Sequence, residues 1–467
     1  MIDTNLIYLS LADAAKLVEK REVSPVDLTE ACIARSEALD GALHAYLTMT
    51  FETALKEARV AADEIAAGRY RGPLHGIPFA IKDLYETAGV RTTAGSQLRE
   101  HFVPAEDART VELLKQAGII MLGKLNLHEW AMGGTNVNEY YPTPRNPWDT
   151  ERVTGGSSGG SGVALAAGYC YGSLGTDTRG SIRIPAALCG ITGIKPTWGR
   201  VSIRGIIPLN WSLDHSGPMA RSAEDCALIL NAIAGYDERD PTSADLPVPD
   251  YAASLESSRL DGVRIGVPRN FFLDKDVVEP VMVETIQSAR QTLASLGAEV
   301  TDVDFPRDIE FSSSSAFFAE AESYHEKQFK EHPEMYGKTI QERMRANSGI
   351  TGVAYVRDRW RQLEVQQGVR NLMRDVDLIL TPTSPVLAPK IAEVDTTIPG
   401  ATLLGRNTSP FNIAGIPTIS IPAGFSPQGQ PIGVQLSGRW WEEGLVLRAA
   451  HAFQQVTDWH LRRPPLA

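Results

Sequence analysis

Apolar positions recur at close to helical spacing through the first 70 residues of the chain. Ser24, Pro25 and Asp27 form a helix start, because a serine hydroxyl can cap free backbone N–H groups, proline suits the first turn and an acid suits the positive end of a helix. Apolar side chains then follow at Leu28, Cys32 and Leu39. The pattern predicts that residues 1–70 are helical.

Further along, short apolar runs alternate with helical patterns. The run at 77–83 stays apolar until it ends in two charges, which is typical of a buried strand that surfaces at a site. A second buried strand is predicted at 119–122, after a helix that ends near Gly118. The later elements are predicted as a strand at 264–267, a helix at 279–296, a strand at 299–303, mostly helix over 305–375, strands at 377–380 and 417–421, and a helix after Trp441. This alternation indicates an α/β sheet.

The chain shows no internal repeat and no change in composition that would mark a linker between domains. Residues 236–262 are rich in proline, aspartate and serine, and they fit a surface crossover better than a hinge. We therefore expect one large α/β domain over residues 1–467.

Composition and charge narrow the class of protein. The chain has 467 residues, 43% hydrophobic and 22% charged, which is typical of a globular protein. Its formal net charge is −12, the opposite of the basic field that nucleic-acid binders usually carry. No apolar run is long enough for a membrane helix, and the N-terminus lacks the pattern of a signal peptide. We expect a cytoplasmic protein that acts on a small molecule and contacts neither nucleic acid nor membrane directly.

The four cysteines, Cys32, Cys170, Cys189 and Cys226, lie far apart and form no CxxC pair. They are expected to be free thiols in a reducing compartment. Cys189 comes nearest to a catalytic thiol, but it follows an apolar run that is typical of a core.

Several catalytic motifs are absent from the sequence. There is no HExxH motif and no Cys/His cluster at zinc spacing, so no metal and no cofactor is expected. Neither Gly-Lys pair belongs to a Walker loop, because Gly123-Lys124 is followed by Leu125 instead of Ser or Thr, and Gly337-Lys338 lacks the upstream glycine. No lysine follows a serine at the spacing of the SxxK hydrolases.

The strongest local feature is the segment GGSSGGSG at 155–162. Such tracts are often flexible linkers, but this one runs directly into the apolar helix predicted at 163–167. A glycine-rich turn that opens a helix can instead present backbone N–H groups to an anion or an oxyanion. The segment also fits GxSxG, the nucleophile elbow of α/β-hydrolases, but no buried strand precedes it and no histidine has an obvious acid partner.

A second polar loop, GTDTRGSIRIP at 175–185, completes a recognisable set. Together with the strand that ends at Lys82, these loops resemble the amidase signature family of serine hydrolases, a group that includes amidases and glutamyl-tRNA amidotransferase A subunits. The resemblance covers most of the chain and is weakest across 240–375. It is carried by GPLHGIPFAIKD at 72–83, GKLNLHEWAMGG at 123–134, NPWDTERVTGGSSGGSG at 146–162, GTDTRGSIRIPAALCGITGIKPTWGR at 175–200, the N-terminal helices and residues 412–438.

The resemblance implies a fold and a catalytic triad. The fold would be a single mixed β-sheet sandwiched between helices, with N-terminal helices at 1–70, the signature core at about 71–235 and a variable helical region at about 305–375. Ser181 would be the nucleophile, Ser157 a bridging serine that follows a cis peptide bond, and Lys82 the base. The backbone N–H groups of Thr178, Arg179, Gly180 and Ser181 would form the oxyanion hole.

The chemistry of this triad requires an uncharged lysine. A serine hydroxyl is a poor nucleophile until a neighbour accepts its proton. Because the reference pKa of lysine is about 10.4, a base that works near neutral pH needs a pKa lower by roughly 3, which costs about 4 kcal/mol. Burial at the end of an apolar strand can supply this change. Asp83 would oppose it, but neighbours in a strand point to opposite faces, so the side chains of Lys82 and Asp83 should diverge.

Other residues have more open roles. Asp177 and Arg183 are expected to brace the second loop, with a surface ion pair as the alternative. Arg179 stands where the family usually has a small residue. Its side chain would either favour substrates with a polar or anionic group near the scissile carbonyl or turn away into an ion pair.

The substrate-binding assignments rest on the resemblance alone. They comprise Ala131 and Met132 of an acyl-binding channel, together with Ser157 and Arg179. Trp440 and Trp441 are expected to anchor the last helix, and His75 is expected to be structural.

The resulting interpretation is an amidase that hydrolyses a linear carboxamide C–N bond through an acyl-enzyme. One alternative is the glutaminase subunit of a tRNA-dependent amidotransferase, which would depend on a partner protein. A carbamate or urethane hydrolase of the same family is another. The physiological substrate stays open, and so does a homodimer.

Overall fold

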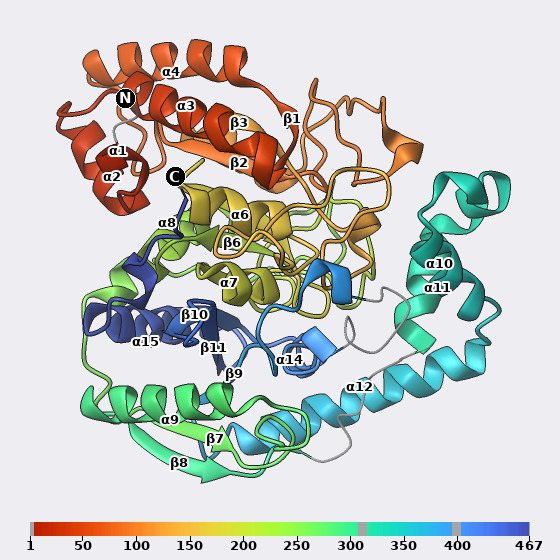
Figure 1. The fold of residues 1–467 in the computed structure, drawn as a ribbon. Helices are drawn as coiled ribbons and strands as arrows, with labels where there is room; N and C mark the ends of the chain where they lie inside the picture. The colour runs from red at the N-terminus through yellow and green to blue at the C-terminus, as the bar shows by residue number, and fades with distance from the viewer. Residues whose placement is uncertain (1–3, 307–314, 395–402, 467) are drawn as a thin grey trace.

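The structure is a computed structural model that describes residues 4–306, 315–394 and 403–466. Within these residues eleven strands form one mixed sheet in the order β1-β3-β2-β4-β6-β5-β10-β11-β9-β7-β8. Helices cover both faces of this sheet (Figure 1). The predicted α/β class, with one large mixed sheet between helices, is confirmed.

The strands are short, and most are fully buried. Their bounds are β1 (Tyr46–Met49), β2 (Pro78–Lys82), β3 (Ile120–Leu125), β4 (Gly172–Thr176), β5 (Thr192–Lys195), β6 (Ser216–Ala220), β7 (Arg264–Pro268), β8 (Glu299–Val303), β9 (Leu378–Pro382), β10 (Thr418–Phe425) and β11 (Pro431–Gly438). β2 is parallel to both β3 and β4, and β7 is parallel to both β8 and β9, whereas the remaining pairs are antiparallel.

Two packed pairs of helices lie against the central strands. α6 packs on α7, and α8 packs on α15, with each pair contacting strands of the middle of the sheet. The helix bounds are α1 (Thr4–Ile7), α2 (Leu11–Glu19), α3 (Pro25–Leu43), α4 (Phe51–Ala66), α5 (Arg109–Ala117), α6 (Gly159–Ala167), α7 (Arg183–Cys189), α8 (Ala223–Ile233), α9 (Pro280–Ser295), α10 (Ser315–Glu331), α11 (Lys338–Ala346), α12 (Gly352–Leu372), α14 (Ser409–Ala414) and α15 (Glu443–Gln455). None of the helices in the described ranges combines the length and the apolar character needed to span a membrane.

The helix start predicted near residue 24 is confirmed. Ser24 caps α3 by accepting a hydrogen bond from the Val26 N–H, and the Asp27 carboxylate accepts one from the Ser24 N–H. The N-terminal region is not wholly helical, however, because β1 lies between α3 and α4 and pairs with β3. Four residues are too few to show a strand period in the sequence.

Four strands, β4, β5, β6 and β11, were not predicted individually. All four are fully buried, so they lack the alternation of apolar and polar residues that marks a half-exposed strand. The glycines of β4 make this strand still harder to recognise in the sequence. A Cβ at Gly172 would overlap the Phe79 ring, so close packing of β4 on β2 requires glycine there.

Candidate active site

Lys82 is the last residue of β2, and it lies beside the last residue of β4 because the two strands are parallel and adjacent. Its Nζ is 2.7 Å from the Ser157 Oγ and 2.7 Å from the Thr176 Oγ1. The lysine side chain is fully buried, and this burial lowers its pKa from 10.5 to about 7, although Asp214 and Asp177 act in the opposite direction. The amine is therefore readily uncharged near neutral pH.

Asp83 points away from this amine, as the strand geometry predicts. Its carboxylate pairs with Lys124 at 3.1 Å and accepts hydrogen bonds from the Thr93 N–H and hydroxyl. Both members of the Asp83–Lys124 pair are fully buried. The Asp83 carboxylate is thus neutralised by Lys124 on the opposite side of the strand. Burial therefore remains the main influence on the pKa of Lys82.

Ser157 lies in the glycine-rich loop that precedes α6, and the Gly156–Ser157 peptide bond is cis, as the resemblance implies. The Ser157 carbonyl accepts a hydrogen bond of 3.1 Å from the His128 N–H, and the Ser158 N–H donates one of 3.2 Å to the Ser181 carbonyl. Three loops from distant parts of the sequence are thereby joined around Ser157.

Ser181 lies in the loop between β4 and α7 and is 8% exposed, whereas Ser157 and Lys82 are at 0%. Its hydroxyl makes no hydrogen bond within the part of the chain that the structure describes. Ser181 is therefore the most accessible of the three side chains, and Ser157 is as deeply buried as Lys82.

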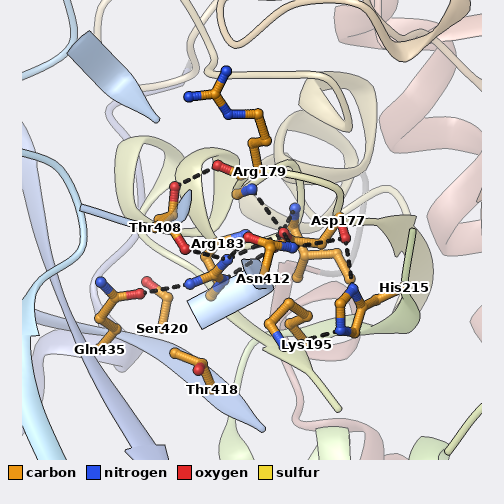
Figure 2. Close-up of polar contacts among 12 residues, drawn as sticks. Asp177, Arg179, Arg183, Lys195, His215, Thr408, Asn412, Thr418, Ser420 and Gln435 are labelled. Atoms are coloured by element: carbon orange, nitrogen blue, oxygen red, sulfur yellow. Dashed lines mark hydrogen bonds and ion pairs between the residues drawn. The ribbon is translucent and has the colours of Figure 1, made fainter. Parts of the chain in front are cut away.

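The loop that carries Ser181 is held by a buried network around Asp177 (Figure 2). The Asp177 carboxylate pairs with the Arg183 guanidinium at 3.0 Å, and Arg183 also donates to the side chains of Asn412 and Gln435. Burial alone would raise the pKa of Asp177, but the Arg183 charge holds it well below its usual range. The predicted bracing role is confirmed, and the alternative of a surface ion pair is wrong.

A backbone N–H group and a hydroxyl of this loop donate to buried carboxylates. The Gly180 N–H donates to the Asp177 carboxylate at 2.7 Å, so it is already committed. Gly180 has a φ of +126°, and a Cβ there would overlap the Thr408 hydroxyl, so only glycine fits. The Thr178 hydroxyl donates to Asp214 at 2.5 Å, and burial raises the pKa of that carboxyl to about 6.

Arg179 departs from the family pattern. Its carbonyl accepts a hydrogen bond of 2.6 Å from the Thr408 hydroxyl, but its side chain lies apart from the buried network (Figure 2). Figure 2 shows its side chain pointing away from Asp177. Its Nε donates to the Ser409 Oγ at 3.1 Å, and its guanidinium lies 5.7 Å from the Phe317 ring centroid. Burial lowers the pKa of Arg179 to about 10, so the group keeps its charge at neutral pH.

Ala131 and Met132 are buried in and after the short 3-10 turn Glu129–Ala131. The Met132 carbonyl accepts a hydrogen bond from Arg343 of α11. Burial raises the pKa of the neighbouring Glu129 to about 7, and its carboxylate accepts the Gly337 N–H at 3.0 Å. The predicted channel residues therefore sit where the variable helical region meets the signature core.

The other residues considered in the sequence analysis make contacts that fit a structural role. Burial raises the pKa of the Cys189 thiol, which donates to the Thr154 carbonyl and is therefore no thiolate nucleophile. His75 is buried beside Glu64. The Trp440 indole donates to the Ala414 carbonyl and the Trp441 N–H to Thr197, which fits an anchor ahead of α15. Among the described residues no three side chains gather as metal ligands.

Several residues of the site had no signal of their own in the sequence. Thr176 contacts Lys82, Asp214 holds Thr178, and Asn412 holds Asp177 through hydrogen bonds to its carbonyl and carboxylate. Asn412 is 235 positions from Asp177 in the chain, so only the fold brings the two together. Thr176 and Asn412 lie in segments that carry the family resemblance, which was their only signal, and Asp214 lies outside those segments.

The comparisons with known proteins agree with this geometry. The Amidase family profile matches residues 27–447. Over 481 residues the chain is 42% identical to the A subunit of the glutamyl-tRNA(Gln) amidotransferase of Methylococcus capsulatus, and the match covers 97% of this chain and 98% of that protein.

Two solved structures extend the comparison to the fold. One belongs to a vestigial protein complex that reveals the evolutionary origins of an s-triazine catabolic enzyme. It has a TM-score of 0.90 at 35% identity and covers 98% of this chain and 100% of that one. The other is the peptide amidase of Stenotrophomonas maltophilia, with a TM-score of 0.86 at 32% identity, covering 98% of each chain. The chain belongs to the amidase signature family. It is an amidohydrolase, an enzyme that cleaves amide C–N bonds.

Proposed function

We propose that this amidohydrolase cleaves a linear carboxamide through a Ser181–Ser157–Lys82 triad and an acyl-enzyme intermediate. The observation that carries the proposal is the 2.7 Å contact between the Lys82 Nζ and the Ser157 Oγ in fully buried surroundings. A lysine with a pKa of about 7 can accept a proton near neutral pH, which an ordinary lysine cannot do.

The acylation step moves one proton along the triad. As the Ser181 Oγ forms a bond to the carbonyl carbon, its proton passes to the Ser157 Oγ, and the Ser157 proton passes to the Lys82 Nζ. The same route returns a proton to the leaving nitrogen while the C–N bond breaks, because an amide anion is a poor leaving group. The Ser157–Ser181 contact forms in the substrate complex, where such hydrogen bonds often tighten.

Deacylation uses the same groups in the same order. Water attacks the acyl carbon and gives up a proton through Ser157 to Lys82. The ester bond to Ser181 then breaks, the serine recovers its proton, and the carboxylic acid is released. No further reactant is needed.

The oxyanion of each tetrahedral intermediate is proposed to lie against the backbone N–H groups of the 178–181 loop. The Thr178, Arg179 and Ser181 amides would supply the hydrogen bonds. The Gly180 amide, which the resemblance includes in the set, would have to be shared with the Asp177 carboxylate. Its main contribution is therefore to fix the loop.

Ala131, Met132 and Arg179 are proposed to shape the acyl site together with Ser157. A charged guanidinium two residues before the nucleophile would favour a substrate with a polar or anionic group near the scissile carbonyl. Replacing Arg179 by glycine should reduce kcat/KM for such substrates more than for neutral ones. An unchanged substrate profile would contradict this assignment.

The triad is tested with Ser181→Ala and Ser157→Ala, and with Ser288→Ala as a control at an exposed helix serine. A panel of amides, esters and carbamates is assayed, and a fluorophosphonate probe reports the nucleophile. Ser181→Ala should lose both labelling and activity. Ser157→Ala should lose roughly a thousandfold in kcat, and the control should keep both. Activity that survives Ser181→Ala would refute the mechanism.

A second candidate is the glutaminase subunit of a tRNA-dependent amidotransferase. The 42% identity to a glutamyl-tRNA(Gln) amidotransferase A subunit, over 97% of this chain, favours it. Such a subunit would release ammonia from glutamine and would need a partner for activity. Assaying the purified chain alone decides between the two: hydrolysis of simple aryl or alkyl amides supports the independent amidase, and activity restricted to glutamine with a partner supports the subunit. The same panel identifies a preference for carbamates.

A further inference from the structure

An apolar row of side chains lies on the outer face of α12. Val353, Val356, Trp360 and Leu363 are 62%, 65%, 65% and 54% exposed. The opposite face of the helix is buried through Val365 and Val369, so α12 is held on the protein while this row faces outward. We refer to the four exposed residues as the α12 stripe.

The spacing of the stripe is that of a helix–helix seam. The four positions follow one another at intervals of three, four and three residues. With 3.6 residues per turn they fall within an arc of about 80°, and they extend about 15 Å along the helix. Isolated surface hydrophobics are common, but a continuous row at this spacing is typical of a face that binds another helix.

Positive charge borders the stripe on both sides. Arg357 and Arg361 flank it on one side and Arg359 on the other. Arg370 lies about two turns beyond Leu363, with its guanidinium 5.1 Å from the Trp440 ring centroid. The two acids of the helix offset part of this charge, because Asp358 pairs with Arg361 at 3.9 Å and Glu364 accepts a hydrogen bond of 3.0 Å from the Trp360 indole. The chain as a whole has a net charge of −12. This basic border on an acidic protein is complementary to an acidic partner.

Two other occupants fit this surface less well. A second copy of the chain would place the α12 arginines against one another, which is unfavourable. A helix that lies on a membrane has a broad apolar face, whereas this stripe spans an arc of only about 80° and the opposite face of α12 is buried on the protein.

A hollow lies beside the stripe at the start of α12, next to the edge that carries Arg359. An open cavity of about 600 Å³ is lined by Trp198, Trp211, Ile350, Tyr355 and Arg359, among other residues. Trp211 is 42% exposed there. The cavity is large enough to accept a bulky apolar side chain from a segment that lies along the stripe, which a flat bilayer would not provide.

We propose that the α12 stripe docks an acidic amphipathic helix of a separate protein. The apolar seam of that helix covers Val353, Val356, Trp360 and Leu363, and its carboxylates face the bordering arginines. A bulky side chain near its end fills the neighbouring cavity. The surface is remote in the chain from the triad, and the inference does not depend on the substrate of the enzyme.

The test uses two synthetic helical peptides about three heptads long, with the same leucine seam and with either glutamate or lysine at the flanking positions. Binding to the intact protein is measured by calorimetry and by Trp360 fluorescence. The acidic peptide should bind at least about tenfold more tightly than the basic one. Equal binding, a preference for the basic peptide, or no binding would overturn the proposal.

Control experiments distinguish an acidic helix from a membrane or a second copy of the chain as the occupant of the α12 stripe. A Val356→Ser/Trp360→Gln/Leu363→Gln variant should lose peptide binding, and an Arg357→Glu/Arg361→Glu variant should prefer the basic peptide, both with unchanged circular dichroism and unchanged hydrolysis of a simple amide. Peptide binding that persists in the first variant contradicts the proposal. Two further results would also contradict it. One is that the wild type, but not this variant, sediments with phosphatidylglycerol vesicles. The other is that the wild type, but not this variant, sediments as a dimer at rising protein concentration.

Discussion

Replacing Lys82 by methionine should make the protein inactive but more stable at neutral pH. Burial lowers the pKa of this lysine from 10.5 to about 7, whereas the unfolded chain keeps the ordinary value. Between these two pKa values the unfolded state binds the additional proton, so the stability of the wild type rises with pH across this range. The penalty is complete below pH 7 and disappears above pH 10.5. Methionine, similar in length and uncharged, carries no such penalty.

The magnitude follows from the pKa change and two hydrogen bonds. At about 1.4 kcal/mol for each pKa unit, the penalty in the wild type is about 4 kcal/mol at pH 7 and about 1 kcal/mol at pH 10. Loss of the contacts with Ser157 and Thr176 costs the variant about 1 kcal/mol each. The Lys82→Met variant should therefore be more stable by about 2 kcal/mol at pH 7 and less stable by about 1 kcal/mol at pH 10.

The assay is urea unfolding of both proteins at pH 7, 8, 9 and 10, followed by circular dichroism and tryptophan fluorescence. The difference in unfolding free energy should shrink by about 3 kcal/mol over this range and change sign. Lys124→Met is the matched control, because Lys124 is equally buried but pairs with Asp83. Removing it leaves an unpaired buried carboxylate, which should destabilise the protein by about 3–5 kcal/mol. If the curves of the wild type and Lys82→Met run parallel with pH, the lysine is not neutralised by burial and the proposed relay lacks its base.

Three further predictions follow from the same site. Because the base must be neutral, kcat/KM should fall tenfold for each pH unit below about 7 and level off above it, and a flat profile between pH 5.5 and 8 would contradict the role of Lys82. Asp177→Asn leaves Arg183 buried without its charge partner, so urea unfolding should show a loss of about 3–5 kcal/mol; a loss below about 1 kcal/mol would mean that the network does not hold the loop. Gly180→Ala forces a side chain onto the Thr408 hydroxyl at a positive φ, so kcat should fall at least about a hundredfold; near-normal turnover would show that the loop tolerates a shift.

Helices and strands could be predicted from the sequence where the pattern of apolar and polar residues was long enough to be recognised. The capped start of α3, the strand that ends at Lys82 and the strand–helix–strand run of β7, α9 and β8 were all predicted near their observed positions. Strands such as β4 and β5 were not, because a fully buried, glycine-containing strand has neither period nor polarity to distinguish it from a loop.

The candidate site likewise has features that the sequence indicated and features that only the fold revealed. The sequence by itself pointed to Lys82, Ser157 and Ser181 as the candidate catalytic residues, because they lie in motifs whose residue types and order are specific. Only the tertiary structure decided that the Lys82 amine is buried 2.7 Å from Ser157, that Asp177 takes the Gly180 N–H, and that Asn412 closes the network. The physical reason is that a pKa and a hydrogen-bond partner depend on the neighbours in space, and those neighbours come from strands and loops up to 235 residues apart in the chain.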